Sequence, residues 1–262
     1  MPLQWTASGI LTPDVGASDY PREAELVLGA AINTYAQRIA ELVERERTFT
    51  RDASHELRSP LTVIKVATDL LLADEGHAGS RKLARRHLER IRKATRDMEA
   101  LLEAFLILAR DAESGLPAED FLVNMVLREE LERAQPLLKD KPVDVRLEEH
   151  CQLLLHAPAK AVGLVLGNLV RNAFQHTASG QVTALVGPDG VRIVDTGSGM
   201  MLDPLHGPMG ASERSGPARN GGVGLSVVRR LSDRFGWPVR FESMPDRGTM
   251  VSIGFPQART QG

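Results

Sequence analysis

The sequence predicts two domains of different fold class, an α-helical hairpin followed by an α+β sandwich with a mixed sheet. The hairpin is indicated by two long segments of helical apolar periodicity on either side of a turn-rich stretch, DEGHAGS at 74–80. The second domain is indicated by alternating helix-like and strand-like segments after a change of composition at 114–119. A chain of 262 residues is long enough to bury two hydrophobic cores.

The first domain is expected to occupy residues 23–113, after an irregular tail at 1–22 that is rich in Pro, Gly, Ser and Asp. In its first helix, which ends near Asp74, apolar residues recur every three or four positions in a coiled-coil seam with one change of phase. The second helix carries a heptad from Ala84 to Ala109. Because the apolar stripe of the hairpin is narrow, a second copy of the chain buries it best. We therefore expect a dimer with a four-helix bundle.

The second domain is expected to occupy residues 119–256 and to leave a short tail at 257–262. Its segments differ in period, with apolar residues alternating in strands and recurring at three or four positions in helices. The predicted helices cover 127–138, 159–175 and 223–235; the predicted strands cover 143–147, 151–155, 181–186, 191–194, 239–243 and 249–255; a long loop covers 196–222. Helices on one face of a mixed sheet follow from this order.

Composition excludes several classes of function. The 32 Lys and Arg residues nearly balance the 34 Asp and Glu residues, and aromatic residues make up only 4%, so we expect no nucleic-acid partner. The only cysteine, Cys151, fits a reducing compartment such as the cytoplasm. No apolar run approaches the ~18 residues of a membrane helix, so we expect no membrane span in this chain.

His55 is a candidate functional residue because of the helix face on which it lies. It stands two residues from the seam positions Ala53 and Leu57, and at about 100° per residue it faces solvent instead of the seam. An exposed imidazole is a nucleophile with a near-neutral pKa. The alternative is an ordinary surface histidine on an amphipathic helix.

The residues around His55 favour the functional interpretation. Glu56 is adjacent, Ser59 lies one turn later on the same face, and Pro60 lacks the N–H of a regular helix. The segment FTRDASHELRSPLT at 49–62 closely resembles the H box of sensor histidine kinases. The resemblance implies that His55 accepts a phosphoryl group, that Glu56 is its general base, and that Ser59 positions a water for dephosphorylation. A purely structural role of Ser59 before Pro60 is the alternative.

A second, dispersed set of motifs follows, without the GxxxxGK[ST] of a P-loop. Asn168 and Asn172 share a helix face, DTGSG at 195–199 ends a strand, GGVGL at 221–225 precedes a helix, and RGT at 247–249 opens the last strand. Glycine turns let backbone approach a flat ligand, and a helix N-terminus favours phosphate. Each motif is weak alone, and for the two asparagines the alternative is a polar stripe whose amides are satisfied within the structure.

The order NLVRNAFQHT, DTGSG, GGVGL and RGT resembles the N box and glycine boxes of the ATP-binding domain shared by histidine kinases, gyrase-type enzymes, Hsp90 and MutL. The resemblance implies that Asn172 coordinates Mg²⁺ and that Asp195 binds the adenine amino group of ATP, with support from Thr249. It also implies a set of glycines that shape the pocket and its lid, namely Gly197, Gly199, Gly222 and Gly224. The remaining implied ATP contacts are Asn168, Gln175, His176 and Leu225, where Gln175 replaces the Lys or Arg frequent in the family.

Together the two resemblances imply the cytoplasmic catalytic core of a two-component sensor histidine kinase. A homodimer would phosphorylate His55 with ATP and pass the phosphoryl group to the receiver domain of a response regulator, and it would also dephosphorylate that regulator. A catalytically silent scaffold and a phosphatase-dominant enzyme are the rival hypotheses. Whether a membrane-anchoring segment precedes residue 1 stays open. A metal site at His150, Cys151 and His156 matches no strong zinc spacing.

Overall fold

The computed structural model describes residues 4–5, 11–12, 22–73, 80–113, 116–199 and 223–261. Contacts divide the chain into two compact units, Met1–His55 and Glu56–Gly262. The first unit holds a short antiparallel pair, β1 (Gln4–Trp5) with β2 (Leu11–Thr12), inside the tail that the sequence predicts as irregular. Among the described helices, none combines the length and the apolar character needed to cross a membrane.

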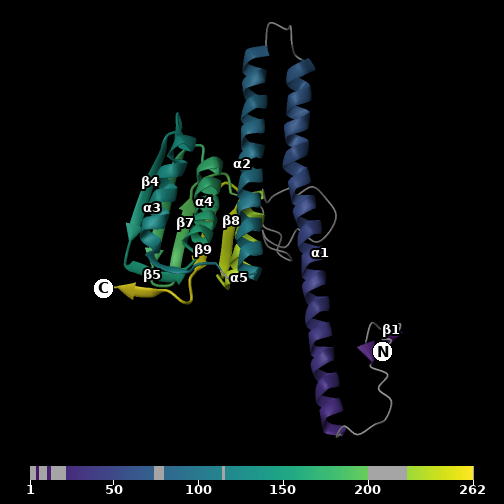
Figure 1. Cartoon of the computed structure of the whole chain (residues 1–262). Helices are drawn as coiled ribbons and strands as arrows, with labels where there is room; N and C mark the ends of the chain where they lie inside the picture. Colours follow the sequence, from purple (N-terminus) through teal and green to yellow (C-terminus); the bar gives the residue numbers. More distant parts are fainter. Residues whose placement is uncertain are drawn as a thin grey trace. The chain divides into compact units, whose positions relative to one another are not determined.

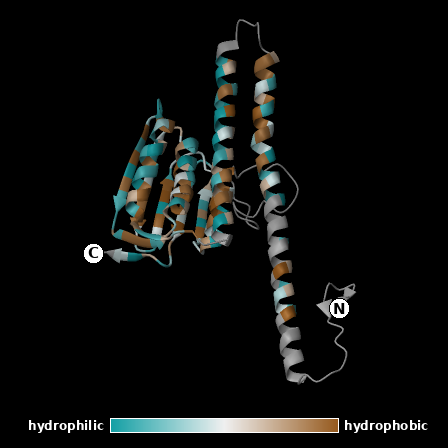
Figure 2. Ribbon diagram, viewed as in Figure 1, coloured by the Kyte–Doolittle hydropathy of each residue, from teal (hydrophilic) through white to brown (hydrophobic). Residues whose placement is uncertain are grey.

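The predicted helical hairpin is present as α1 (Arg22–Ala73) and α2 (Ser80–Glu113). Helix α1 runs without interruption through Pro60. In the second unit, buried residues recur at intervals of seven, at 60 and 67 on α1 and at 87, 94 and 101 on α2. A separate set of apolar side chains stays exposed on the same helices, including Leu61, Leu70, Leu88, Leu102 and Leu106. Figure 2 shows hydrophobic positions along both helices.

The second unit contains the predicted mixed sheet, with strand order β4-β6-β7-β9-β8. Its strands are β4 (Val143–Glu149), β6 (Gly180–Gly187), β7 (Gly190–Asp195), β8 (Val239–Met244) and β9 (Gly248–Gly254). Only β4 and β6 pair in parallel, and the other neighbours are antiparallel. A parallel pair needs a long connection, which here runs through helix α4 (Ala159–His176).

A second, three-stranded sheet has the order β10-β5-β3, formed by β3 (Glu119–Leu122), β5 (Gln152–Ala157) and β10 (Arg259–Gln261). The sequence predicts only β5 of these. Strand β3 is the four-residue EDFL and β10 is the polar RTQ, so neither has the apolar alternation that identifies a strand. Each is formed by pairing with β5, in antiparallel register.

Helices cover one face of the five-stranded sheet, as the sandwich prediction requires. They are α3 (Val123–Ala134), α4 and α5 (Val223–Phe235), and Figure 1 shows α3 and α4 side by side. Alternate residues of β6 and β7 are buried beneath them, whereas the intervening residues are half-buried or exposed. The predicted helix at 127–138 begins earlier, at Val123, and becomes the 3₁₀ turn η1 (Gln135–Leu138) where Pro136 lacks an N–H.

We predict that two glycines with positive φ differ strongly in tolerance to alanine. At Gly190 (φ +140°) a Cβ would overlap the carbonyl oxygen of Ile253 on β9, whereas at Gly236 (φ +68°) the described residues leave open space. Backbone strain and overpacking each cost about 1–3 kcal/mol. Gly190→Ala should therefore lower the free energy of unfolding by about 2–5 kcal/mol and Gly236→Ala by about 1–2 kcal/mol. Urea unfolding of both variants measures the difference, and equal losses would contradict the close antiparallel pairing of β7 with β9 at Gly190.

Candidate functional site

His55 lies exposed on α1, as its helix face predicts, and Ser59 is exposed four residues later. Pro60 is buried in the same helix, and because it has no N–H, the backbone carbonyl of Glu56 loses its usual helical donor. Just beyond, the Thr62 hydroxyl donates to the carbonyl of Arg58 at 2.8 Å. The H-box segment is therefore a continuous helix with two exposed polar side chains, His55 and Ser59, one turn apart.

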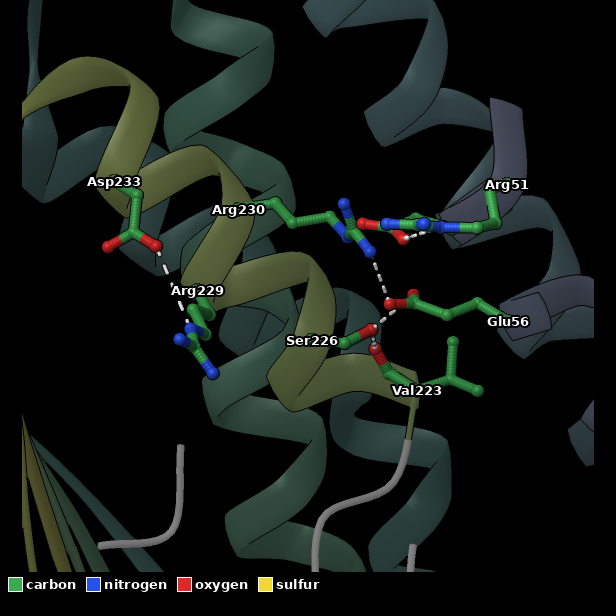
Figure 3. Close-up of polar contacts among 8 residues, drawn as sticks. Arg51, Glu56, Val223, Ser226, Arg229, Arg230 and Asp233 are labelled. Atoms are coloured by element: carbon green, nitrogen blue, oxygen red, sulfur yellow. Dashed lines mark hydrogen bonds and ion pairs between the residues drawn. The ribbon is translucent and has the colours of Figure 1, made fainter. Parts of the chain in front are cut away.

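The carboxylate of Glu56 is bound by two residues of α5 (Figure 3). The Arg230 guanidinium lies 2.6 Å from Oε1, and the Ser226 hydroxyl lies 2.8 Å from Oε2, so both oxygens are engaged. The Arg230 guanidinium also stacks over the Phe105 ring of α2, 5.6 Å from its centre. The sequence does not predict these partners of Glu56, because they stand 170 and 174 positions away.

The two asparagines of α4 differ in environment. Asn168 is buried, and its amide donates to the carbonyl of Leu164 at 2.7 Å. A Cβ at Gly224, at the start of α5, would lie 2.9 Å from the side-chain amide oxygen (Oδ1) of Asn168. The two helices are therefore in close contact there. Asn172 is half-buried one turn later. Asn168 thus has a packing role of its own, in addition to the role that the resemblance implies.

Asp195 ends strand β7 and is only 5% exposed. The Gly197 N–H donates to its Oδ1 at 2.9 Å, and Thr249 is its partner in the β7–β9 register. Burial raises the pKa of the Asp195 carboxyl, although the N–H groups of Gly197 and Thr249 act in the opposite direction. A buried carboxyl whose pKa is raised by desolvation is a candidate for a binding site.

The loop after Asp195 packs tightly on its neighbours. A side chain at Gly197 would overlap the carbonyl oxygen of His176, at the end of α4. One at Gly199, whose φ is +61°, would overlap the carbonyl of Met244. Thr249 is buried, and its hydroxyl lies 2.8 Å from that of Ser243. Gly197 and Gly199 therefore allow close packing of this loop against neighbouring backbone, a use that differs from the approach to a flat ligand predicted from the sequence.

Of the residues predicted for the site, the structure brings Asp195, Gly197 and Thr249 together with the end of α4. A second contact joins Asn168 and Gly224. Gln175 and His176 are exposed on the last turn of α4, and partial burial lowers the pKa of His176. Leu225 is buried in the core of the domain. Gly222 lies outside the described residues.

The two histidines considered for a metal site each lie near an acidic side chain. His156 pairs with Asp120 at 2.7 Å, and His150 lies 3.9 Å from Glu148. Across the part of the chain that the structure describes, no cluster of three or more His, Cys, Asp or Glu side chains could hold a metal ion.

Two family models match the chain and together cover well over half of it. The first, the His Kinase A (phospho-acceptor) domain, matches residues 45–114, and the second, the histidine kinase-, DNA gyrase B- and HSP90-like ATPase, matches residues 158–259.

Relatives with similar sequences and a solved structure with a similar fold are also found. The Sensor protein QseC of Escherichia coli O157:H7 is 29% identical over 254 residues, which are 92% of this chain and 54% of that protein. The Sensor protein DivL of Caulobacter vibrioides is 30% identical over 248 residues, 90% of this chain and 31% of that protein. The chain therefore spans about half or less of these relatives. The Acinetobacter baumannii histidine kinase AdeS has a similar fold, with a TM-score of 0.52 at 17% identity over 77% of this chain and 98% of that one.

We predict that Asp195 destabilises the ligand-free protein at neutral pH. Because the folded-state pKa of this carboxyl is raised, ionisation costs more in the folded than in the unfolded chain. The cost appears as pH rises above the unfolded pKa near 4 and is absent below it. Asp195→Asn should therefore raise the free energy of unfolding at pH 7, and the gain should shrink as the pH falls toward the unfolded pKa near 4. Urea unfolding at both pH values tests this, and an unchanged or lower stability at pH 7 would contradict it.

Proposed function

Because this chain belongs to the sensor histidine kinases and carries their phospho-acceptor and ATPase domains, we propose that it phosphorylates its own His55 with ATP and passes the phosphoryl group to an aspartate of a response regulator. One observation carries the proposal. An exposed histidine with an adjacent carboxylate stands on a helix, and a buried carboxyl, Asp195, stands among close-packed glycines in the following domain of the same chain.

The adenine of ATP is proposed to bind at Asp195. A buried carboxylate is a strong acceptor for an exocyclic amine, and the Gly197 N–H already fixes one of its oxygens. Gly197 and Gly199 keep side chains out of the loop, so the backbone can approach a flat ring. Thr249 supports the carboxyl from the neighbouring strand.

The phosphates and Mg²⁺ are proposed to lie beyond Asp195, toward Asn172. Mg²⁺ is held by one or two protein oxygens together with phosphates and waters, so an amide oxygen suffices and no acidic cluster is needed. When bound, the ion neutralises the phosphate charge during transfer. Gln175 would donate its amide N–H to a phosphate, in place of a cation. The starting turn of α5, after Gly224, offers backbone N–H groups of the kind that bind phosphate.

Phosphoryl transfer is proposed to use His55 and Glu56. A ring nitrogen of His55 attacks the γ-phosphorus, an N–P bond forms, and the P–O bond to ADP breaks with its electrons on the ADP oxygen. Glu56 then accepts the ring proton. Arg230 and Ser226 each bind one of its oxygens, and because each carboxylate oxygen has a second lone pair, Glu56 keeps acceptor capacity for the imidazole.

The exposed residues of α1 and α2 support proposals about a second copy of the chain and about the response regulator. The apolar side chains exposed on α1 and α2, such as Leu61, Leu88 and Leu102, are proposed to pack against a second copy in a four-helix bundle. Ser59, exposed one turn from His55, is proposed to hold the water that dephosphorylates the regulator. The need for cellular ATP and a regulator agrees with a cytoplasmic location.

We predict that His55→Gln abolishes phosphate incorporation while nucleotide affinity stays within twofold of the wild type. The side chain lies on α1, outside the domain that holds Asp195. His150→Gln, at an exposed histidine of the ATPase domain, is the matched control and should retain full incorporation. The label is measured after incubation with γ-labelled ATP and Mg²⁺, and acid treatment should remove it because phosphohistidine is acid-labile. Acid-labile labelling of His55→Gln would refute the assignment.

A second prediction distinguishes the residue proposed to bind adenine from the residue proposed to bind Mg²⁺. Asp195→Asn replaces an acceptor oxygen with a donor, and an unpaired buried group costs about 1–3 kcal/mol. This variant should lose roughly tenfold or more in ATP affinity with or without Mg²⁺. Asn172→Ala should lose affinity only when Mg²⁺ is present. Calorimetric titration of each variant in Mg²⁺ and in EDTA tests both, and equal losses of Asn172→Ala in the two buffers would place the metal on another residue.

A further inference from the structure

Lys141 is absent from the predicted site, yet its side chain binds the end of the helix that carries the site. It lies between η1 and β4, in a turn where Asp140 has φ +65°. The Lys141 N–H donates to the carbonyl of Leu138 at 2.9 Å, and its own carbonyl accepts from Val143 at 2.9 Å. These two backbone bonds fix the residue at the start of the parallel strand pair.

The Lys141 ammonium donates to three carbonyl oxygens at the C-terminus of α4. They belong to Phe174 at 2.7 Å, Thr177 at 3.0 Å and Gln175 at 3.4 Å. The last carbonyls of a helix have no partner within the helix, and a cation there also interacts favourably with the helix dipole. Burial lowers the pKa of Lys141, the expected result of placing an ammonium against backbone instead of in water.

The other carbonyls of this last turn are also bound. The N–H and hydroxyl of Thr177 donate to Ala173, at 3.1 and 2.7 Å. The N–H of Ser198 lies 3.5 Å from the carbonyl of His176, and Gly197 packs against that same carbonyl. The end of α4 is therefore held by Lys141 and also contacts the DTGSG loop.

This geometry gives Lys141 a defined influence on the nucleotide site. If the ammonium is lost, the carbonyls of Phe174 and Thr177 lose a charge-assisted donor, and the last turn of α4 is free to fray. Fraying moves the His176 carbonyl, against which Gly197 is packed without space for a methyl group. Gly197 is also the donor that fixes the Asp195 oxygen.

We propose that Lys141 is a positioning residue of the nucleotide site, which holds the end of α4 so that the loop 195–199 presents Asp195 to the adenine. The inference rests on the proposed ATP-binding function and adds to it a residue that touches neither nucleotide nor metal.

The test uses Lys141→Met, which keeps most of the side-chain volume but removes the donors, and Lys139→Met as the matched control, an exposed lysine in the same turn. Lys141→Gln retains an amide donor and serves where the methionine variant fails to fold. Calorimetry measures the Kd for ADP, and backbone amide exchange in the ligand-free proteins measures the order of residues 173–177 and 195–199. Both are done at a temperature where each variant is folded by circular dichroism.

We expect Lys141→Met to raise the Kd at least tenfold and to speed exchange in both segments, Lys141→Gln to have an intermediate effect, and Lys139→Met to match the wild type. A residue with a merely structural role would lower the unfolding temperature without changing the Kd of the folded protein. If the wild-type protein binds ADP and Lys141→Met binds it with the same Kd, the positioning role of Lys141 is overturned and the proposed function is not. A wild-type protein that binds no ADP overturns the proposed function, and unchanged exchange then also overturns the positioning role.

Discussion

The candidate site depends on the contact between the last turn of α4 and the loop that leaves β7. A carboxyl at Asp195 can stay buried because the Gly197 N–H binds it, and Gly197 can take that place because it has no side chain to overlap the carbonyl of His176. Lys141 and Thr177 satisfy the other carbonyls of the same turn. The sheet register then brings Thr249 beside Asp195. Each of these interactions constrains the backbone, so together they fix the orientation of the Asp195 carboxyl.

The second constraint is on Glu56, whose two oxygens are bound by Arg230 and Ser226 of α5. Helix α5 starts at Val223, within the glycine motif, and contacts Asn168 of α4 through Gly224. A single helix thus contacts both the carboxylate next to His55 and helix α4. Changes at the start of α5 therefore have a direct structural route to Glu56.

The sequence predicts those parts of the molecule that depend on local pattern. Heptad periodicity predicts the hairpin and the exposure of His55, and the strand followed by glycines predicts the position of Asp195. Long-range contacts are not predictable in this way. Nothing near Lys141 indicates that it binds carbonyls 33 to 36 residues away, and nothing near Glu56 indicates Arg230. Strands β3 and β10 are missed for a related reason, since both are short and polar and form only through pairing with β5.

Binding of an adenine nucleotide where α4 meets the loop after β7 is the claim on which the phosphotransfer chemistry depends. Hydrogen exchange measured by mass spectrometry, with and without ADP and Mg²⁺, tests it most directly. Slower exchange on addition of ADP in both 173–177 and 195–199 is the predicted result. Unchanged exchange in both segments, with protection appearing instead around residues 116–118 and 234–237 where a separate cavity of about 310 Å³ lies, would contradict it.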